Sequence, residues 1–145
     1  MPKPKIAVLV SALIVLVIVF SGCVDGKTTE AGLSMAPLSD MPSEIRQTSV
    51  KVQQAYQFNL ANPDIMQEIP CYCGCGAVGH KSNFNCYAKI NADGSMSFDG
   101  HALGCSICVD ITHDTMRLIE EEHSIPEIQT YVDAQYSRYG PPTTP

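Results

Sequence analysis

The feature that most constrains this chain is the crowding of its cysteines. Six of the seven lie in the 38 residues from Cys71 to Cys108. Three of these six stand two residues apart in the stretch 71–75, which reads CYCGC. A chain that curls around one point there brings the three sulfur atoms together, and Gly74 and Gly76 permit the positive φ that such curling requires. We therefore expect an irregular, glycine-containing loop that presents several thiols to one place.

More donors of the same chemical kind follow the loop. A helical pattern begins at residue 100 or 101 and runs to about residue 122, which places His101, Cys105 and Cys108 on one helix face at i, i+4 and i+7. Thiolate and imidazole are soft to borderline ligands that suit Cu(I) and Zn(II). The sequence therefore predicts a metal site, and its candidate ligands are Cys71, Cys73, Cys75, His80, Cys86, His101, Cys105 and Cys108.

Two other interpretations of the cysteines stay open. Three disulfides would staple an extracellular structural or interaction module, although cysteines one or two residues apart close only short loops and so stabilise little. The pair Cys105 and Cys108 would alternatively serve a thiol–disulfide oxidoreductase, although no βαβ pattern surrounds it. Among metal groups an iron–sulfur cluster ranks third, because the expected compartment is oxidising.

The N-terminal end predicts export. Two lysines precede the apolar run Ile6–Phe20, and Ser21, Gly22 and Cys23 follow it. A basic start, an apolar run shorter than the about 20 residues of a membrane span, and small residues at its end are typical of a signal peptide. The ending resembles that of a lipoprotein signal, so we expect lipidation of Cys23; an uncleaved anchor helix is the alternative. Both place the domain at the outer face of the cytoplasmic membrane.

The length and charge of the chain narrow the remaining choices. A chain of 145 residues fits one domain. Its net charge of -6 becomes -8 without the two lysines of the signal, which argues against nucleic acid as a partner. The sequence contains no nucleophile elbow, phosphate loop or metal-hydrolase helix motif, so an enzymatic function is disfavoured. We divide the chain into a signal (1–22), a tether (23–41), a Cys-rich domain (42–140) and a tail (141–145).

Apolar periodicity and turn residues predict the elements of the domain. Residues 43–60 form a helical pattern, and Pro63 opens a short helix that ends at residue 68 or 69. The dipeptide at 93–94, Asp-Gly, marks the turn of a short β-hairpin. Ser124 and Glu127 form a capping box that opens a last helix, which ends near residue 140. The expected fold class is mainly α: a small helical domain with a central Cys-rich loop and a short β-hairpin.

The hexapeptide at 70–75, PCYCGC, resembles the motif after which a family of bacterial and archaeal lipoproteins is named. The segments 79–83 (GHKSN) and 86–87, and the later His101, Cys105 and Cys108, are also similar to that family. The resemblance covers about residues 56–116. It implies an exported or lipid-anchored Cys-rich domain that handles metal, at the eight ligand positions given above, and it supplies no substrate or reaction.

Together these features predict a membrane-anchored extracytoplasmic protein that stores, sequesters or transfers a metal through its Cys/His cluster. The sequence favours copper slightly over zinc, because Cu(I) is the softest of the candidate ions. Zinc would instead form a site that helps the domain to fold. The expected partners are the membrane and a metal-handling or redox protein.

Overall fold

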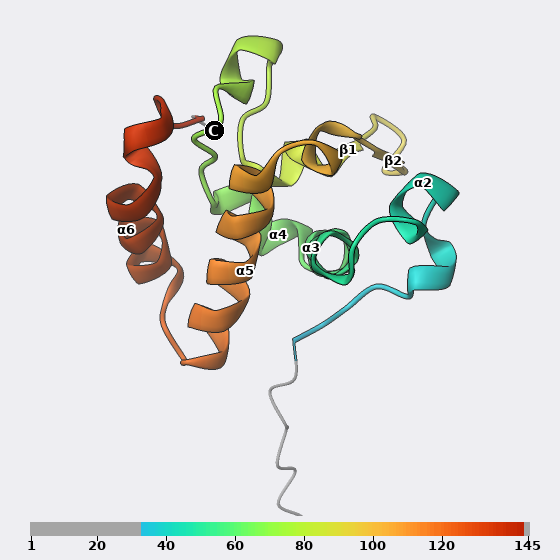
Figure 1. Ribbon diagram of the computed structural model, residues 1–145, viewed down its shortest axis with the longest axis horizontal. Coiled ribbons are helices and arrows are strands. Elements are labelled where there is room, and N and C mark those ends of the chain that lie inside the picture. Colours follow the sequence, from blue (N-terminus) through green and yellow to red (C-terminus); the bar gives the residue numbers. More distant parts are fainter. Residues whose placement is uncertain (1–32, 144–145) are drawn as a thin grey trace, which may run out of the picture. The chain divides into compact units, whose positions relative to one another are not determined.

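The computed structural model describes residues 33–143 (Figure 1). The predicted signal, Cys23 and most of the predicted tether lie outside the described residues. Among residues 33–143 no helix is long and apolar enough to cross a membrane. The fold is mainly α, as expected, with one small antiparallel sheet. The elements are η1 (Leu38–Asp40), α2 (Ser43–Arg46), α3 (Val50–Ala61), α4 (Pro63–Glu68), η2 (Cys75–Val78), η3 (Asn83–Cys86), β1 (Ala88–Ile90), β2 (Met96–Phe98), η4 (His101–Leu103), α5 (Ser106–Glu120), α6 (Ile125–Tyr136) and η5 (Ser137–Tyr139).

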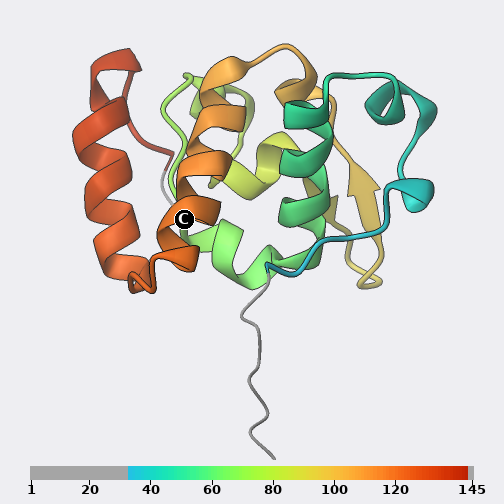
Figure 2. The ribbon, with the colours of Figure 1, turned by 60° about the horizontal axis from the view of Figure 1, so that its bottom comes forward.

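Helix α5 is the centre of the domain. It packs against α3 on one side and against α6 on the other, as Figure 2 shows. Its buried residues recur three or four positions apart, the spacing of one apolar helix face. Cys108 belongs to this face, so the helix holds its sulfur in the core. The buried residues of α5 are Cys108, Val109, Ile111, Thr112, Thr115 and Leu118.

Two of the expected long helices are interrupted. The single helix predicted over 43–60 is wrong, because α2 and α3 are separated at residues 47–49. There the Thr48 hydroxyl donates to the Ile45 carbonyl (2.6 Å), and the Gln53 amide donates to the Arg46 carbonyl (2.8 Å). Side chains that satisfy backbone groups in this way compete with a continuous helix. The helix expected to begin at residue 100 or 101 is likewise the short turn η4, followed by a break and then by α5.

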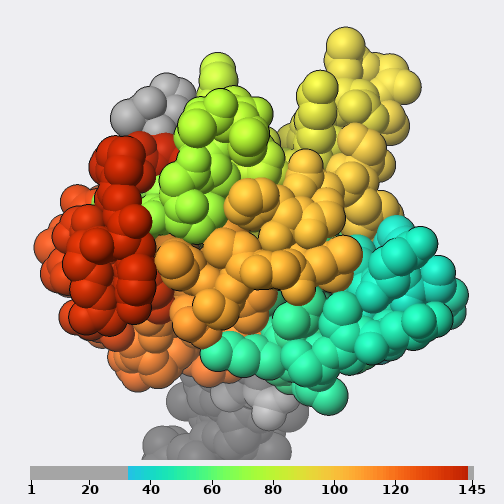
Figure 3. Space-filling model, turned by 45° about the horizontal axis from the view of Figure 1, so that its top comes forward, coloured from blue at the N-terminus to red at the C-terminus, as the bar shows by residue number. Residues whose placement is uncertain are grey.

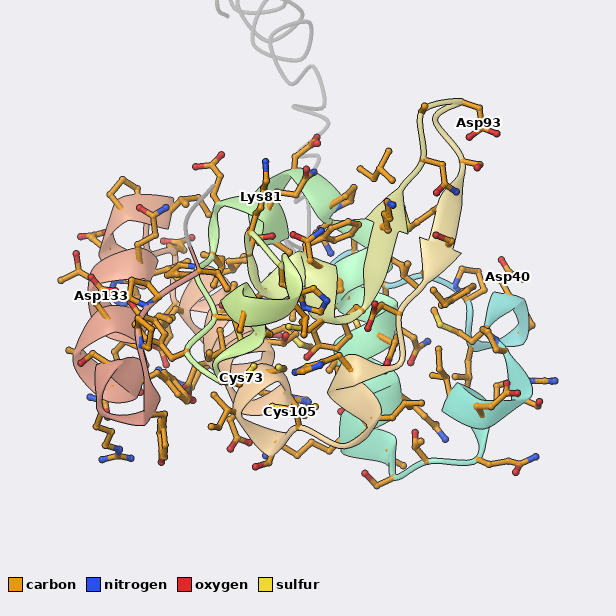
Figure 4. All side chains as sticks on the ribbon, turned by 90° about the horizontal axis from the view of Figure 1, so that it is seen from above. Asp40, Cys73, Lys81, Asp93, Cys105 and Asp133 are labelled. Atoms are coloured by element: carbon orange, nitrogen blue, oxygen red, sulfur yellow. The ribbon has the colours of Figure 1, made fainter. Side chains whose placement is uncertain are left out.

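The remaining predicted elements are confirmed. Helix α4 begins with Pro63, and α6 opens with the complete capping box of Ser124 and Glu127. The hairpin pairs Ala88 with Phe98 and Ile90 with Met96, and its turn holds Gly94 at a φ of 81°. The hairpin projects from the body of the domain, with Asp93 at its tip (Figure 4).

Both flanking segments join the fold more closely than the expected boundaries at 42 and 140 imply. Residues 33–41 were expected in the tether, yet the Ala36 amide donates to the Gln57 carbonyl (2.9 Å) and Met41 is buried. At the other end Thr143 pairs with Cys71. The Thr143 amide donates to the Cys71 carbonyl (2.8 Å), and the Cys71 amide donates to the Thr143 hydroxyl (2.8 Å). The C-terminal segment therefore supports the Cys-rich loop.

Candidate metal centre

The loop that follows α4 aims its thiols inward. Ile69 and Pro70 end the helix, and the chain then runs so that Cys71 and Cys73 face one side while Tyr72 is buried on the other. Side chains two residues apart on an extended chain face the same way. Gly74 adopts the left-handed conformation, with a φ of 83°, and turns the chain into η2, where Cys75 is also buried. The expected positive φ is confirmed at Gly74 but not at Gly76, which lies within η2; the second left-handed glycine of this loop is Gly79.

Five sulfur atoms converge at this point from three parts of the chain. The Cys71 Sγ lies 3.4 Å from that of Cys73, 3.5 Å from that of Cys108 and 3.9 Å from that of Cys86. The sulfurs of Cys73 and Cys108 are 3.5 Å apart, and those of Cys75 and Cys86 are 3.6 Å apart. All six cysteines among the described residues are free thiols. A sulfur with several neighbours at similar distances is the arrangement of a shared ligand sphere rather than of covalent pairs.

Two imidazoles border the sulfur cluster. The His101 Nε2 lies 3.4 Å from the Cys73 sulfur, and the His80 Nδ1 lies 3.5 Å from the Cys86 sulfur. The two rings contact each other edge to face, with centroids 5.2 Å apart. Two overlapping groups of four ligand atoms lie within 4.8 Å of one another. The first group is Cys71, Cys73, Cys75 and Cys86. The second group is Cys73, Cys86, His101 and Cys108.

These separations match tetrahedral coordination by a thiophilic ion. Sulfurs bound at about 2.3 Å to tetrahedral zinc stand about 3.8 Å apart, and a bound sulfur and imidazole nitrogen stand about 3.6 Å apart. The sulfur–sulfur separations here are 3.4 to 3.9 Å, and the sulfur–nitrogen separations are 3.4 and 3.5 Å. The Cys/His cluster therefore has the chemistry and the spacing to hold a metal ion.

Of the eight sequence-predicted ligands, Cys105 is the one that the structure does not bring into the cluster. It is the N-cap residue of α5 and lines a separate hollow with Lys51 and Asp110. The predicted stripe of His101, Cys105 and Cys108 assumed one continuous helix, whereas the break after η4 turns Cys105 away. Figure 4 labels Cys105 at the start of α5 and Cys73 on the Cys-rich loop.

The profile of a protein family, described as protein of unknown function with PCYCGC motif, matches residues 13–145. The chain belongs to this family. No curated protein and no solved structure matches it. The PCYCGC motif thus coincides with the loop that delivers three of the five clustered sulfurs.

Asp99 is a site residue that the sequence reasoning missed. Its side chain accepts a hydrogen bond from the His101 amide (2.8 Å), and its other oxygen lies 3.8 Å from the His80 Nε2. His80 therefore presents one ring nitrogen to the Cys86 sulfur and the other to a carboxylate. Metal-bound imidazoles commonly face a carboxylate on this side, and the 3.8 Å separation here is longer than a direct hydrogen bond. No sequence spacing signals the contact, because it depends on where the hairpin ends.

A buried polar network holds the helix side of the PCYCGC centre. The Thr112 hydroxyl accepts hydrogen bonds from the amides of Asn59 (3.0 Å) and Asn83 (2.8 Å) and lies 2.9 Å from the Tyr87 hydroxyl. It donates to the Cys108 carbonyl at 3.2 Å. All four side chains are fully buried. Buried networks of this kind fix one arrangement of the core, and here they fix the turn that carries Cys108.

The thiols divide into one easily ionised group and several that resist ionisation. Hydrogen bonds with Cys108 and then Cys86 hold the pKa of Cys71 far below its ordinary value. Burial raises the pKa of Cys73, and the hydrogen bond with Cys71 raises the pKa of Cys108. The cluster by itself therefore favours one thiolate, and further thiolates need a cation beside them.

One edge of the PCYCGC centre reaches solvent. Cys71, Cys86 and Cys108 are fully buried, while Cys73 and His101 are partly exposed. Beside His80 a cleft of about 560 Å³ separates the loop after η2 from the hairpin, and Figure 3 shows the hollow between these two projections. An ion can thus approach the cluster without unfolding of the domain.

Proposed function

We propose that this domain binds zinc or copper through its Cys/His cluster, and that it stores, sequesters or transfers the metal. The observation that carries this proposal is the convergence of five thiols and two imidazoles at the separations of a tetrahedral ligand sphere. Thiols that are buried together without a metal would leave several weak hydrogen-bonding groups competing for one another.

Charge favours a divalent ion at this site. Each thiolate ligand brings one negative charge, and a buried excess of negative charge is unfavourable. A Zn(II) ion cancels one charge more than a Cu(I) ion bound by the same ligands. On this ground we propose zinc ahead of copper, whereas softness alone favours copper.

The exposed edge supports exchange of the metal. A purely structural zinc site is closed by four protein ligands, whereas a protein that exchanges its metal needs at least one ligand residue that solvent or a partner can reach. Cys73 and His101 offer that path, since both retain contact with solvent. A metal-handling or redox protein that docks there would reach the ion through these two side chains.

The place of action that we propose is the outer face of the cytoplasmic membrane. It is supported by the signal-like N-terminus and by Cys23 in a lipoprotein-like context. Cells that express the chain and are fed a labelled fatty acid should label it in the membrane fraction, and Cys23→Ser should abolish the label. Labelling that survives Cys23→Ser would contradict lipidation at this residue.

Metal analysis of the full chain tests the binding function directly. The chain is purified from detergent without chelator and without oxygen, and its zinc and copper are counted by mass spectrometry. We expect bound metal in the native chain, a loss of at least half of it in Cys108→Ser, and no loss in the matched control Cys105→Ser. A folded native chain that is free of metal would refute the proposal, and equal losses in the two variants would refute the ligand assignment.

A further inference from the structure

We propose that the cluster is a two-metal centre, in which two tetrahedral ions share the sulfur of Cys71. This inference rests on the proposed metal binding and adds the number of ions and the bridging ligand. It follows from how many donors converge and from which of them lie within bonding range of a common ion.

The number of ligands matches this arrangement. Five sulfurs and two imidazole nitrogens give seven donors. Two tetrahedra that share one corner require seven ligands, because each ion takes four and one is counted twice. A single tetrahedral ion would leave three donors beside it without a metal. A single ion would therefore not account for the convergence of all seven donors.

The first ion takes its ligands from the Cys-rich loop, η4 and the first turn of α5. Cys71, Cys73 and Cys108 form a nearly equilateral triangle of sulfurs, with sides of 3.4, 3.5 and 3.5 Å. The His101 Nε2 lies 3.4 Å from the Cys73 sulfur, and a His101 ring nitrogen lies within 4.8 Å of the Cys108 sulfur. Three thiolates and one imidazole are a standard zinc ligand set.

The second ion has its ligands beside η3. The Cys86 sulfur is the hub here, at 3.9 Å from Cys71, 3.6 Å from Cys75 and 3.5 Å from the His80 Nδ1. The Asp99 carboxylate lies 3.8 Å from the other nitrogen of His80, on the side where metal-bound imidazoles commonly face a carboxylate. This half again offers three thiolates and one imidazole.

Cys71 is the ligand common to both halves. Its sulfur contacts a sulfur of each half, and its side chain is fully buried. In the alternative arrangement, Cys73 and Cys86 would both bridge the two ions, and Cys71 and Cys108 would then bind different ions. Terminal sulfurs of two ions joined by two bridges stand more than about 5 Å apart by tetrahedral geometry. The 3.5 Å between Cys71 and Cys108 instead places them on one ion.

Charge agrees with two divalent ions. Five thiolates carry five negative charges and two divalent ions carry four positive charges, so the filled centre has a net charge of one unit. One divalent ion bound by the four thiolates of Cys71, Cys73, Cys75 and Cys86 would have a net charge of two units, so the two-ion centre is no more highly charged than such a one-ion site.

Cadmium reports both the number of ions and the bridge. The full chain, stripped of metal in detergent under reducing conditions, is titrated with cadmium-113 and followed by thiolate absorbance and by cadmium NMR. We expect saturation at two equivalents and two resonances that split each other through the shared sulfur. Cys71→Ser should abolish the splitting, Cys75→Ser should remove one resonance, and the control Cys105→Ser should change neither. Circular dichroism verifies that each variant is folded.

The outcomes separate this inference from the proposed function. Saturation at one equivalent, or two resonances without mutual splitting, would overturn the bridged centre and leave metal binding intact. Absence of cadmium binding by the folded chain would overturn both. Splitting that persists in Cys71→Ser would show that another sulfur is the bridge, which also overturns the assignment.

Discussion

Replacement of Thr112 by valine tests whether the buried network supports the centre. The substitution keeps the shape of the side chain and removes the hydroxyl around which two amides and one phenol gather at 2.8 to 3.0 Å. It also removes the hydrogen bond to the Cys108 carbonyl. The change therefore acts on hydrogen bonding and leaves the packing of α5 as it is.

The structure gives the size of the effect. Both asparagine amides keep a backbone carbonyl acceptor after the substitution, the first at 2.9 Å and the second at 3.3 Å. The Tyr87 hydroxyl loses its one partner among the described residues. A buried polar group left without a partner costs about 1–3 kcal/mol, and the two weakened amides add to this. We expect Thr112→Val to lower the free energy of unfolding by about 2–4 kcal/mol.

The assay is urea unfolding of the metal-loaded chain, in a cycle with Tyr87→Phe. Because Tyr87→Phe removes the orphaned hydroxyl, it should cost little or nothing in the Thr112→Val background, with a coupling energy of about 1–2 kcal/mol. Thr115→Val is the matched control, since its buried hydroxyl donates only to the carbonyl of Ile111 in its own helix (2.9 Å). Additive losses, or equal losses for the two threonines, would refute the reasoning.

Three shorter predictions concern pH, the C-terminal segment and the last helix. Metal ligands must be deprotonated, so metal loading should release protons and the metal affinity should fall as the pH is lowered. Calorimetry in buffers of different ionisation enthalpy counts the released protons. A count of zero would contradict thiolate coordination. Gly140→Ala should destabilise the domain by about 1–3 kcal/mol and weaken metal binding, because an added Cβ would meet the Tyr72 carbonyl oxygen at 3.1 Å. The control is Gly104→Ala, which has open space around the added Cβ and should not change the thermal unfolding. Ser124→Ala should remove the capping box of α6 and lower stability by about 1 kcal/mol with metal content unchanged, and a loss of metal there would mean that α6 acts on the site.

The elements that were predicted correctly are those that depend on residues close together in the sequence. The capping box at Ser124, the turn before Gly94 and the proline at the start of α4 each depend on residues a few positions apart, and each forms as expected. The glycine-bent loop is also local, because Gly74 needs only its own left-handed conformation. The convergence of its sulfurs could therefore be anticipated before any tertiary contact was known.

Tertiary contacts explain what the sequence could not reveal. The position of Asp99 beside His80 depends on the path of the hairpin, and the Thr112 network depends on how α3 and α5 pack. The only sequence sign of the break at residues 104–105 is a single glycine within a helical pattern, which is a weak indication of a helix end. The apolar periodicity therefore predicted one continuous helix. That break is the reason why Cys105 leaves the ligand stripe.

The pairing of Cys71 with Thr143 is a contact between residues that lie 72 positions apart. A contact of this range forms only after most of the intervening chain has folded into place, because closing so long a loop costs conformational entropy. The backbone of Cys71 therefore depends on a segment far along the chain. A substitution that weakens the docking of residues 140–143 should loosen the start of the Cys-rich loop without touching any cysteine.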